Sequence, residues 1–352
     1  MGRQTIREAR PAPARAVGAD GHVVATADDA DDTGHAVPAG SVRTGRPHRT
    51  RPTRPTRRPG RKGRGRQWPG AVFIAPHMLV LALFMVVPTI YAIYTSLYTS
   101  RLIGGTRYSG LANYRTVLSS PEFWDGVRRV LVFAAVQVPL TIAVAFFFAA
   151  VFEAGVVRFS RFFRTVFFVP FAVPGVVAAV MWSFLLLPVF GPYSKAMSWL
   201  GFGHVDFFSS GMILPTIVLI VLWEWTGYNM TILYTSLKAV PREITEAAVV
   251  GGASLTTIIL RIKLPMVRPT IVMLLFLNMV GALQLFTEPS ILAAFQPQAV
   301  SYGFTPSLYV YNTAVGSGEY NLGAAAAVLL AMIIGAISLA AFAVRRRNGE
   351  FR

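Results

Sequence analysis

The 352-residue sequence contains no cysteine and few charged residues. The absence of cysteine excludes disulfides, thiolate metal sites and cysteine nucleophiles, although it does not define the redox compartment. Charged residues make up 14% of the chain, against about 25% in soluble domains. Hydrophobic residues make up 54%, and the mean hydropathy is +0.52. This composition is typical of a membrane protein.

The sequence also lacks the usual signatures of catalysis. There is no GxxxxGK[ST] sequence, so we expect no phosphate-binding loop of that kind. The glycine-rich segment 60–66 lacks the strand and helix that such a loop requires. No Ser/His/Asp set and no metal-spaced His/Asp/Glu cluster is present, and His77 stands alone in an apolar run, as a packed or pore-facing residue. We therefore predict that the chain is not an enzyme and binds no metal or cofactor itself.

The N-terminal segment 1–69 is strongly basic. It holds 15 of the 33 Lys and Arg residues, interspersed with Pro, Gly and Thr, and has no apolar face to bury. We predict a disordered tail that orients the first span. The alternative, nucleic-acid or anionic-lipid binding, is less favoured because aromatic residues are not interleaved. The following apolar run exceeds the 7–15 residues of a signal peptide, so we expect it to remain as an anchor.

Six windows contain the roughly 20 apolar residues that a membrane-crossing helix needs. They are residues 71–97, 128–152, 165–190, 211–236, 269–293 and 321–344. The sequence therefore predicts an all-α membrane protein with a six-span domain over 70–344 and a short tail over 345–352. Several prolines fall inside these windows, which is tolerated where neighbouring helices or cavity water satisfy the freed carbonyls. They are Pro76, Pro88, Pro139, Pro170 and Pro174.

The distribution of Lys and Arg predicts the orientation of the spans. With the N-terminus inside, the tails and the loops 153–164 and 237–268 hold 27 of the 33 basic residues. Cytoplasmic loops carry such an excess. Both termini and the long loop 238–268 are therefore expected in the cytoplasm.

The loop 238–268 has the signals of two short helices. Pro241 suits the first turn of a helix, and Gly251-Gly252 is expected to end it. Ser254 can cap a second helix that runs through Ile262, and Pro265 is expected to end that helix. One interpretation is an interfacial helix pair without a partner.

The residue spacing in this loop favours a different interpretation. Counting from Glu246, small residues follow at +1, +2 and +6, and an I-x-L-P sequence occupies +16 to +19. This resembles the EAA loop of permease subunits in binding-protein-dependent ABC importers. The matching positions are Glu246, Ala247, Ala248, Gly252, Ile262, Leu264 and Pro265. The Asp that many members have before the glycine is replaced here by Gly251.

The resemblance extends over residues 70–344 and is to carbohydrate-type permeases of the maltose and glycerol-phosphate kind. Segments 110–127, 162–191 and 223–248 are similar to the first outer loop, third span and fourth span of such permeases. The chain departs from the family at Arg129-Val130 and at Ser194. The resemblance implies a type I importer fold in the bacterial cell membrane and import of a sugar, oligosaccharide or polyol.

The same resemblance implies several partners. The short helix of the EAA loop is expected to dock on a cytoplasmic ATPase subunit, and ATP and Mg²⁺ would bind to two such subunits rather than to this chain. A second, homologous permease is expected to form a heterodimer with it, and an extracytoplasmic binding protein would deliver the solute.

Polar residues inside the last spans are candidates for the substrate path, because such groups usually face the bundle interior. They are Glu224, Tyr228, Asn229, Asn278, Gln284 and Glu288. Carboxylates, amides and aromatic rings suit hydroxyl-rich sugars, and the resemblance places sugar contacts in these spans. The same residues could instead only join helices, by hydrogen bonds worth about 0.6 kcal/mol each. A rival function is an ion-coupled secondary transporter or channel that uses Glu224.

Overall fold

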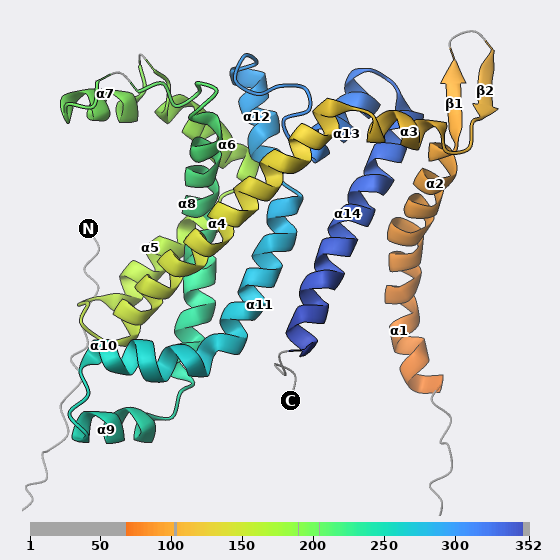
Figure 1. Cartoon of the computed structure of the whole chain (residues 1–352). Helices are drawn as coiled ribbons and strands as arrows, with labels where there is room; N and C mark the ends of the chain where they lie inside the picture. Colours follow the sequence, from red (N-terminus) through yellow and green to blue (C-terminus); the bar gives the residue numbers. More distant parts are fainter. Residues whose placement is uncertain (1–67, 102–103, 189, 204, 348–352) are drawn as a thin grey trace, which may run out of the picture. The chain divides into compact units, whose positions relative to one another are not determined.

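The computed structural model describes residues 68–101, 104–188, 190–203 and 205–347 (Figure 1). The expected disorder of the basic tail therefore lies outside the described residues, apart from two residues at the start of the first helix. The predicted all-α class is confirmed, with one small β-hairpin in addition. The helices are α1 Trp68–Leu81, η1 Ala82–Val86, α2 Val87–Ser96, α3 Ala112–Leu118, α4 Pro121–Glu153, α5 Ser160–Ala172, α6 Gly175–Leu185, α7 Pro192–Trp199, α8 Ile213–Lys238, α9 Arg242–Val250, α10 Leu255–Thr257, η2 Ile258–Lys263, α11 Leu264–Leu283, α12 Thr287–Phe295, α13 Pro306–Tyr311, η3 Asn312–Gly316 and α14 Tyr320–Arg347.

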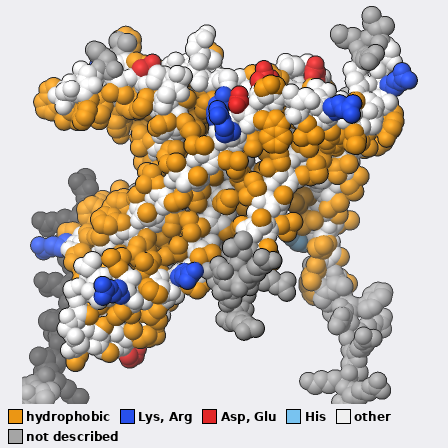
Figure 2. Space-filling view, viewed as in Figure 1, with side chains coloured by type: hydrophobic (Ala, Val, Ile, Leu, Met, Phe, Trp, Pro, Cys, Tyr) orange, Lys and Arg blue, Asp and Glu red, His pale blue; other side chains and the backbone are white. Residues whose placement is uncertain are grey.

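Five helical stretches among the described residues are long and apolar enough to cross a membrane, and one bent pair of helices makes a sixth candidate. The stretches are Val72–Ser96, Pro121–Glu153, Ile213–Lys238, Leu255–Phe295 and Tyr320–Ala343, and the bent pair is α5 with α6. On the visible face, hydrophobic side chains dominate the middle of the molecule and charged ones lie toward its two ends (Figure 2).

The third predicted span, residues 165–190, is wrong as a continuous helix. Helix α5 ends at Ala172 and α6 begins at Gly175, at an angle of 98° to it. The break follows from Pro174, because the residue before a proline avoids helical geometry. Val173 accordingly has an extended conformation, with φ −77° and ψ 128°. Pro170 lies inside α5 without ending it.

The helix that leads into the fifth span continues where the sequence predicted an end. Pro265 does not end a helix, because α10, η2 and α11 follow one another without a break from Leu255 to Leu283. The π-helical turn η2 precedes the proline, and the N–H of Leu264 donates to the carbonyl of Ile259. A widened turn of this kind changes the hydrogen-bond register of the backbone. A proline directly after it, in the first turn of α11, therefore interrupts no regular α-helical run.

Helices α4 and α8 pack against each other through the centre of the bundle (Figure 1). Their buried side chains form two apolar clusters. One includes Phe133, Ile217 and Leu292, and the other includes Met230 and Leu274. Helix α11 contributes to both clusters, so α4, α8 and α11 each bury side chains in both.

The first span packs much less tightly. None of its most apolar window is buried, and it joins the rest of the chain mainly where α2 packs against α14. There the side-chain amide of Asn321 donates to the carbonyl of Thr95 at 2.9 Å. His77 is exposed on this span. The residue is therefore not packed in the described part of the chain.

A β-hairpin that the sequence did not reveal follows α2. Strands β1 (Tyr98–Arg101) and β2 (Gly105–Tyr108) pair antiparallel, with Tyr98 opposite Tyr108. The buried Asn113 of α3 donates to the carbonyls of Ser96 and Tyr98 at 2.8 and 2.7 Å. The hairpin marks one end of the bundle, which we call the hairpin end. The opposite end holds α9, the start of α1 and the end of α14, and we call it the α9 end (Figure 1).

Candidate functional site

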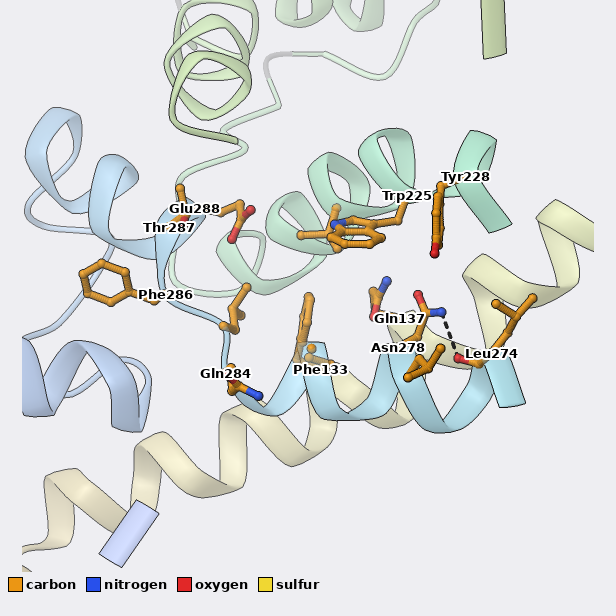
Figure 3. A pocket seen from close by; sticks show the side chains of 15 residues that line it. Phe133, Gln137, Trp225, Tyr228, Leu274, Asn278, Gln284, Phe286, Thr287 and Glu288 are labelled. Carbon is orange, nitrogen blue, oxygen red and sulfur yellow. Dashed lines mark hydrogen bonds between the residues drawn. The ribbon is translucent and has the colours of Figure 1, made fainter. Parts of the chain in front are cut away.

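A cavity of about 440 Å³ lies between α4, α8, α11 and α12 (Figure 3). Each helix contributes one face, because the lining positions recur at helical spacing. On α8 these are Val221, Trp225 and Tyr228, and on α4 they are Phe133 and Gln137. Residues three or four positions apart lie on the same side of a helix. The cavity is thus a seam between spans and is lined by a mixture of aromatic, aliphatic and amide side chains.

Two asparagines join α8 to α11 beside this cavity. The amide of Asn278 donates to Oδ1 of Asn229 at 2.8 Å, and the amide of Asn229 donates back to Oδ1 of Asn278 at 3.3 Å. Asn229 is fully buried. Asn278 lines the cavity and also donates to the carbonyl of Leu274. The buried asparagine thereby holds the lining one in place.

An aromatic group forms one wall next to the asparagines. The rings of Phe171 and Tyr228 stack with centroids 4.6 Å apart, at an angle of 23°. Trp225 meets both rings edge-on, at 5.4 and 5.9 Å. Phe171 is the penultimate residue of α5. The break between α5 and α6 therefore lies directly beside the aromatic wall.

Four of the six predicted path residues line the cavity: Tyr228, Asn278, Gln284 and Glu288. Asn229 lies behind Asn278 as its hydrogen-bond partner. Glu224 is not among the lining residues. It precedes Trp225 by one position, which turns its side chain by about 100° around the helix. Whether any of these residues contacts a solute stays a prediction.

Glu224 instead lies against Glu288 at the start of α6. A Cβ built on Gly175 would be 3.8 Å from Oε1 of Glu288 and 3.9 Å from Oε1 of Glu224. Both glutamates are buried, and Oε1 of Glu224 has no hydrogen-bond partner among the described residues. The two carboxyl groups, one from α8 and one from α12, thus lie near each other at the break in the third span.

The sequence reasoning missed Gln137. This residue is buried in α4, donates to Oγ1 of Thr141 at 2.9 Å, and lines the cavity opposite α8. A signal was present, because Gln137 is an uncharged polar residue in the middle of the second apolar window. Only polar residues of the later spans were expected to line the path, and Gln137 lies in an earlier one.

The second candidate site is α9, at the other end of α8. All its residues are exposed or half-buried, and it packs extensively against no other element of the described chain. Ile244, Val249 and Val250 nevertheless expose apolar side chains, and Val250 is 90% exposed. Glu246 is also exposed, and among the described residues it makes no ion pair. A short helix with exposed apolar and acidic side chains is suited to binding another protein.

The end of α9 has a defined geometry. The N–H of Ala253 donates to the carbonyl of Ala248 and that of Gly252 to the carbonyl of Val249, which is the Schellman pattern. Gly252 occupies the left-handed region with φ +79°. Ser254 then caps the next helix by accepting from the N–H of Thr257 at 3.3 Å. The expected helix end and the expected cap are both present.

Of the other predicted coupling residues, Ala247 is exposed and Ala248 half-buried on α9. Ile262 and Leu264 are half-buried and Pro265 is exposed, where η2 passes into α11. These three lie on the helical arm that leads from α9 into the fifth span. Their part in coupling stays a prediction.

Comparisons with known proteins identify the family. Residues 137–347 match the family described as binding-protein-dependent transport system inner membrane component. The lactose transport system permease protein LacF of Rhizobium radiobacter is 27% identical over 289 residues, covering 79% of this chain and 94% of LacF. The sn-glycerol-3-phosphate transport system permease protein UgpA of Escherichia coli O6:K15:H31 is 30% identical over 217 residues, covering 61% and 73%.

A similar fold occurs in a solved structure. It is that of a bacterial alginate ABC transporter in complex with an alginate pentasaccharide-bound periplasmic protein, and the matching chain has a TM-score of 0.71 and 21% sequence identity. The match covers 80% of this chain and 95% of the other. The chain therefore belongs to the family of inner membrane components of binding-protein-dependent transport systems, as a membrane-spanning permease subunit and not as an enzyme.

Proposed function

We propose that this subunit forms the path by which a carbohydrate enters the cell in an ATP-driven ABC importer. The cavity carries the proposal, because its amides can bond to hydroxyl groups and its Trp225 and Tyr228 rings offer faces for stacking. The named relatives support it, since they transport lactose or sn-glycerol-3-phosphate or belong to an alginate importer. Membership of the family disfavours the rival function, an ion-coupled transporter built around Glu224.

The test is uptake of labelled sugars into liposomes that contain the complete importer. We expect uptake that requires both ATP and the binding protein, with a solute that the binding protein also binds. Uptake driven by an ion gradient in the absence of ATPase subunits would contradict the proposal.

We further infer that α9 lies in the cytoplasm and docks on an ATPase subunit. The excess of Lys and Arg in the loops on its side and the exposed apolar residues of α9 support this. The start of α1 and the end of α14 lie at the same end of the bundle as α9, which agrees with both termini in the cytoplasm of a bacterial cell (Figure 1). ATP and Mg²⁺ would bind to the ATPase subunits.

A second permease subunit is expected to complete the membrane part, as a heterodimer. None of the most apolar window of the first span is buried, so this surface is open to a second subunit as well as to lipid. Purification of the importer and identification of its chains by mass spectrometry tests the heterodimer. A complex with two copies of this chain and no other permease would contradict it.

Asn278→Leu is expected to lower solute uptake about fivefold while the protein still folds. The change removes a lining amide, and a lost hydrogen bond costs about 1 kcal/mol. It also removes both hydrogen bonds to the buried Asn229, which keeps its bond to the carbonyl of Trp225, at a stability cost of about 1.2 kcal/mol for two bonds of about 0.6 kcal/mol each. Ser183→Ala is the control, because this buried hydroxyl donates to its own helix and does not line the cavity. Equal uptake by the two variants would place the solute elsewhere.

Gly252→Asp is expected to weaken coupling between ATP hydrolysis and uptake. Most side chains in the left-handed conformation cost about 1–2 kcal/mol, and Asp costs less. The new carboxylate also lies at the C-terminal end of α9, where the macrodipole disfavours negative charge, so the turn after α9 should change and misdirect the helix. Gly251→Ala is the matched control. Its φ is −71°, and the added Cβ would meet only carbonyl oxygens at 3.4 Å. The measurement is solute transported per ATP hydrolysed, and an unchanged ratio for Gly252→Asp would contradict the prediction.

A further inference from the structure

A buried ion pair joins the loop that carries α9 to the long helix α4. Nζ of Lys263 lies 2.8 Å from Oε1 of Glu153, and the two side chains are 7% and 13% exposed. A second ion pair, between Arg128 and Asp125, is 3.8 Å long, exposed and within one helix. A shielded pair between distant segments fixes geometry far more tightly than an exposed pair does.

The ion pair joins the ends of two helical elements that are far apart in the sequence. Glu153 is the last residue of α4, and Lys263 is the last residue of η2, 110 positions later. The neighbouring residues Phe152 and Val267 belong to the buried apolar cluster at this end, and Ile259 packs against it. The segment 255–264 therefore lies on the bundle, whereas α9 projects from it (Figure 1).

Helix α4 continues from this ion pair to the cavity. Gln137 and Phe133 line the cavity wall, about four to six turns of helix from Glu153. Apolar contacts allow two surfaces to slide, because they have no fixed direction. A short, shielded ion pair at 2.8 Å resists such sliding.

We propose that Glu153 and Lys263 form a positioning clamp that makes the segment 255–264 and α4 move as one body. A displacement of α9 by a docked ATPase then reaches the cavity wall through α4, as well as through α11. This inference rests on the proposed docking of α9, and it assigns positioning roles to two residues outside the EAA positions and outside the cavity.

The clamp is distinguished from a merely stabilising contact by replacing both charges. A single change such as Lys263→Met leaves a buried unpaired carboxylate and is expected to reduce folding. The double change Glu153→Met with Lys263→Met keeps the bulk without charge, and such apolar replacements are often neutral for stability. In liposomes with the complete importer, we expect normal assembly and ATP hydrolysis, but at least tenfold less solute transported per ATP. A wild-type ratio overturns the clamp.

The control is the exposed pair, changed in the same way by Asp125→Met with Arg128→Met. This variant should keep the wild-type ratio, because the pair lies within α4 and is open to solvent. The ATPase subunits should copurify with the double variant of Glu153 and Lys263 as with the wild type. If Glu246→Lys releases the ATPase while that double variant stays fully coupled, the clamp fails and the docking proposal survives. If Glu246→Lys changes nothing, the docking proposal itself fails.

A second measurement keeps the test decisive if the methionine pair folds poorly. The chain has no cysteine, so Glu153→Cys with Lys263→Cys can be joined selectively by a bifunctional thiol reagent whose reach matches the original side chains. We expect low coupling before the reaction and recovery after it, because the covalent link replaces the ion pair. Coupling that stays low or falls further on cross-linking would overturn the clamp.

Discussion

Gly227→Ala is expected to lower the yield and the melting temperature of the folded protein, although alanine is the better helix former. In an unpacked helix the change would favour folding by about 0.5–1 kcal/mol. In this chain, a Cβ on Gly227 would collide with the backbone carbonyl of Phe167 and lie 2.9 Å from Cα of Phe168. Overpacking a core costs about 1–3 kcal/mol, occasionally more, and here the obstacle is backbone that cannot rotate away. The collision therefore outweighs the gain in helix propensity.

The measurement is the yield and melting temperature of the detergent-purified subunit. A net loss of about 2 kcal/mol should lower Tm by about 5 °C, and we expect little monodisperse protein. Gly335→Ala is the matched control, since it is also a helix-interior glycine and no atom lies within 4 Å of its added Cβ. Equal yields from the two variants would mean that α5 and α8 separate easily, which contradicts the packing described above.

Gly227 also shows what the sequence could and could not reveal. Gly227 lies in the segment 223–248, which resembles the fourth span of such permeases, but the reason for the glycine appears only where α5 packs against α8. Apolar length predicted six spans, because that length is set by the membrane and not by packing. Five helical stretches of the described chain are long and apolar enough, and the bent pair of α5 and α6 is a sixth candidate. The class of fold was therefore predictable from one chain.

The two backbone features that were predicted incorrectly both involve prolines. Pro174 lies in an unbroken apolar run, and hydropathy cannot distinguish a straight helix from one bent by 98°. Pro265 was expected to stop a helix. It follows a π-helical turn in which the N–H of Leu264 donates to the carbonyl of Ile259, and this change of hydrogen-bond register lets the helix continue through the proline. In both cases a proline restricts the local backbone conformation, and the surrounding packing decides whether the helix breaks or continues.

Some of the residues at the candidate cavity were predictable from the sequence, and others were not. Polar residues within apolar spans were expected to lie inside the bundle. Asn229 and Asn278 do so as a pair, whereas Gln284 is exposed. The side on which a residue faces depends on helix rotation, which the sequence of one span does not fix. Glu224 therefore faces Glu288 rather than the cavity, while Gln137 of an earlier span lines it.

Glu246→Lys is expected to reduce ATP-driven uptake at least tenfold without impairing membrane insertion. Glu246 is exposed on a helix that packs little against the rest of the described chain. The substitution should therefore change the free energy of unfolding of the subunit by no more than about 0.5 kcal/mol. A charge-assisted hydrogen bond to a basic group on the ATPase would be worth about 1.5–3 kcal/mol. Its loss, with a like charge put in its place, corresponds to a tenfold or larger effect on docking.

The decisive measurement for this variant is retention of the ATPase during purification, together with uptake. Glu319→Lys is the control, because it makes the same charge reversal at an exposed glutamate near the start of α14, at the hairpin end. Loss of the ATPase from Glu246→Lys alone would localise the effect to α9, since overall net charge changes equally in both variants. A Glu246→Lys importer that keeps its ATPase and its uptake would instead make α9 an interfacial helix without a partner. Its exposed Ile244, Val249 and Val250 would then have to contact the membrane surface.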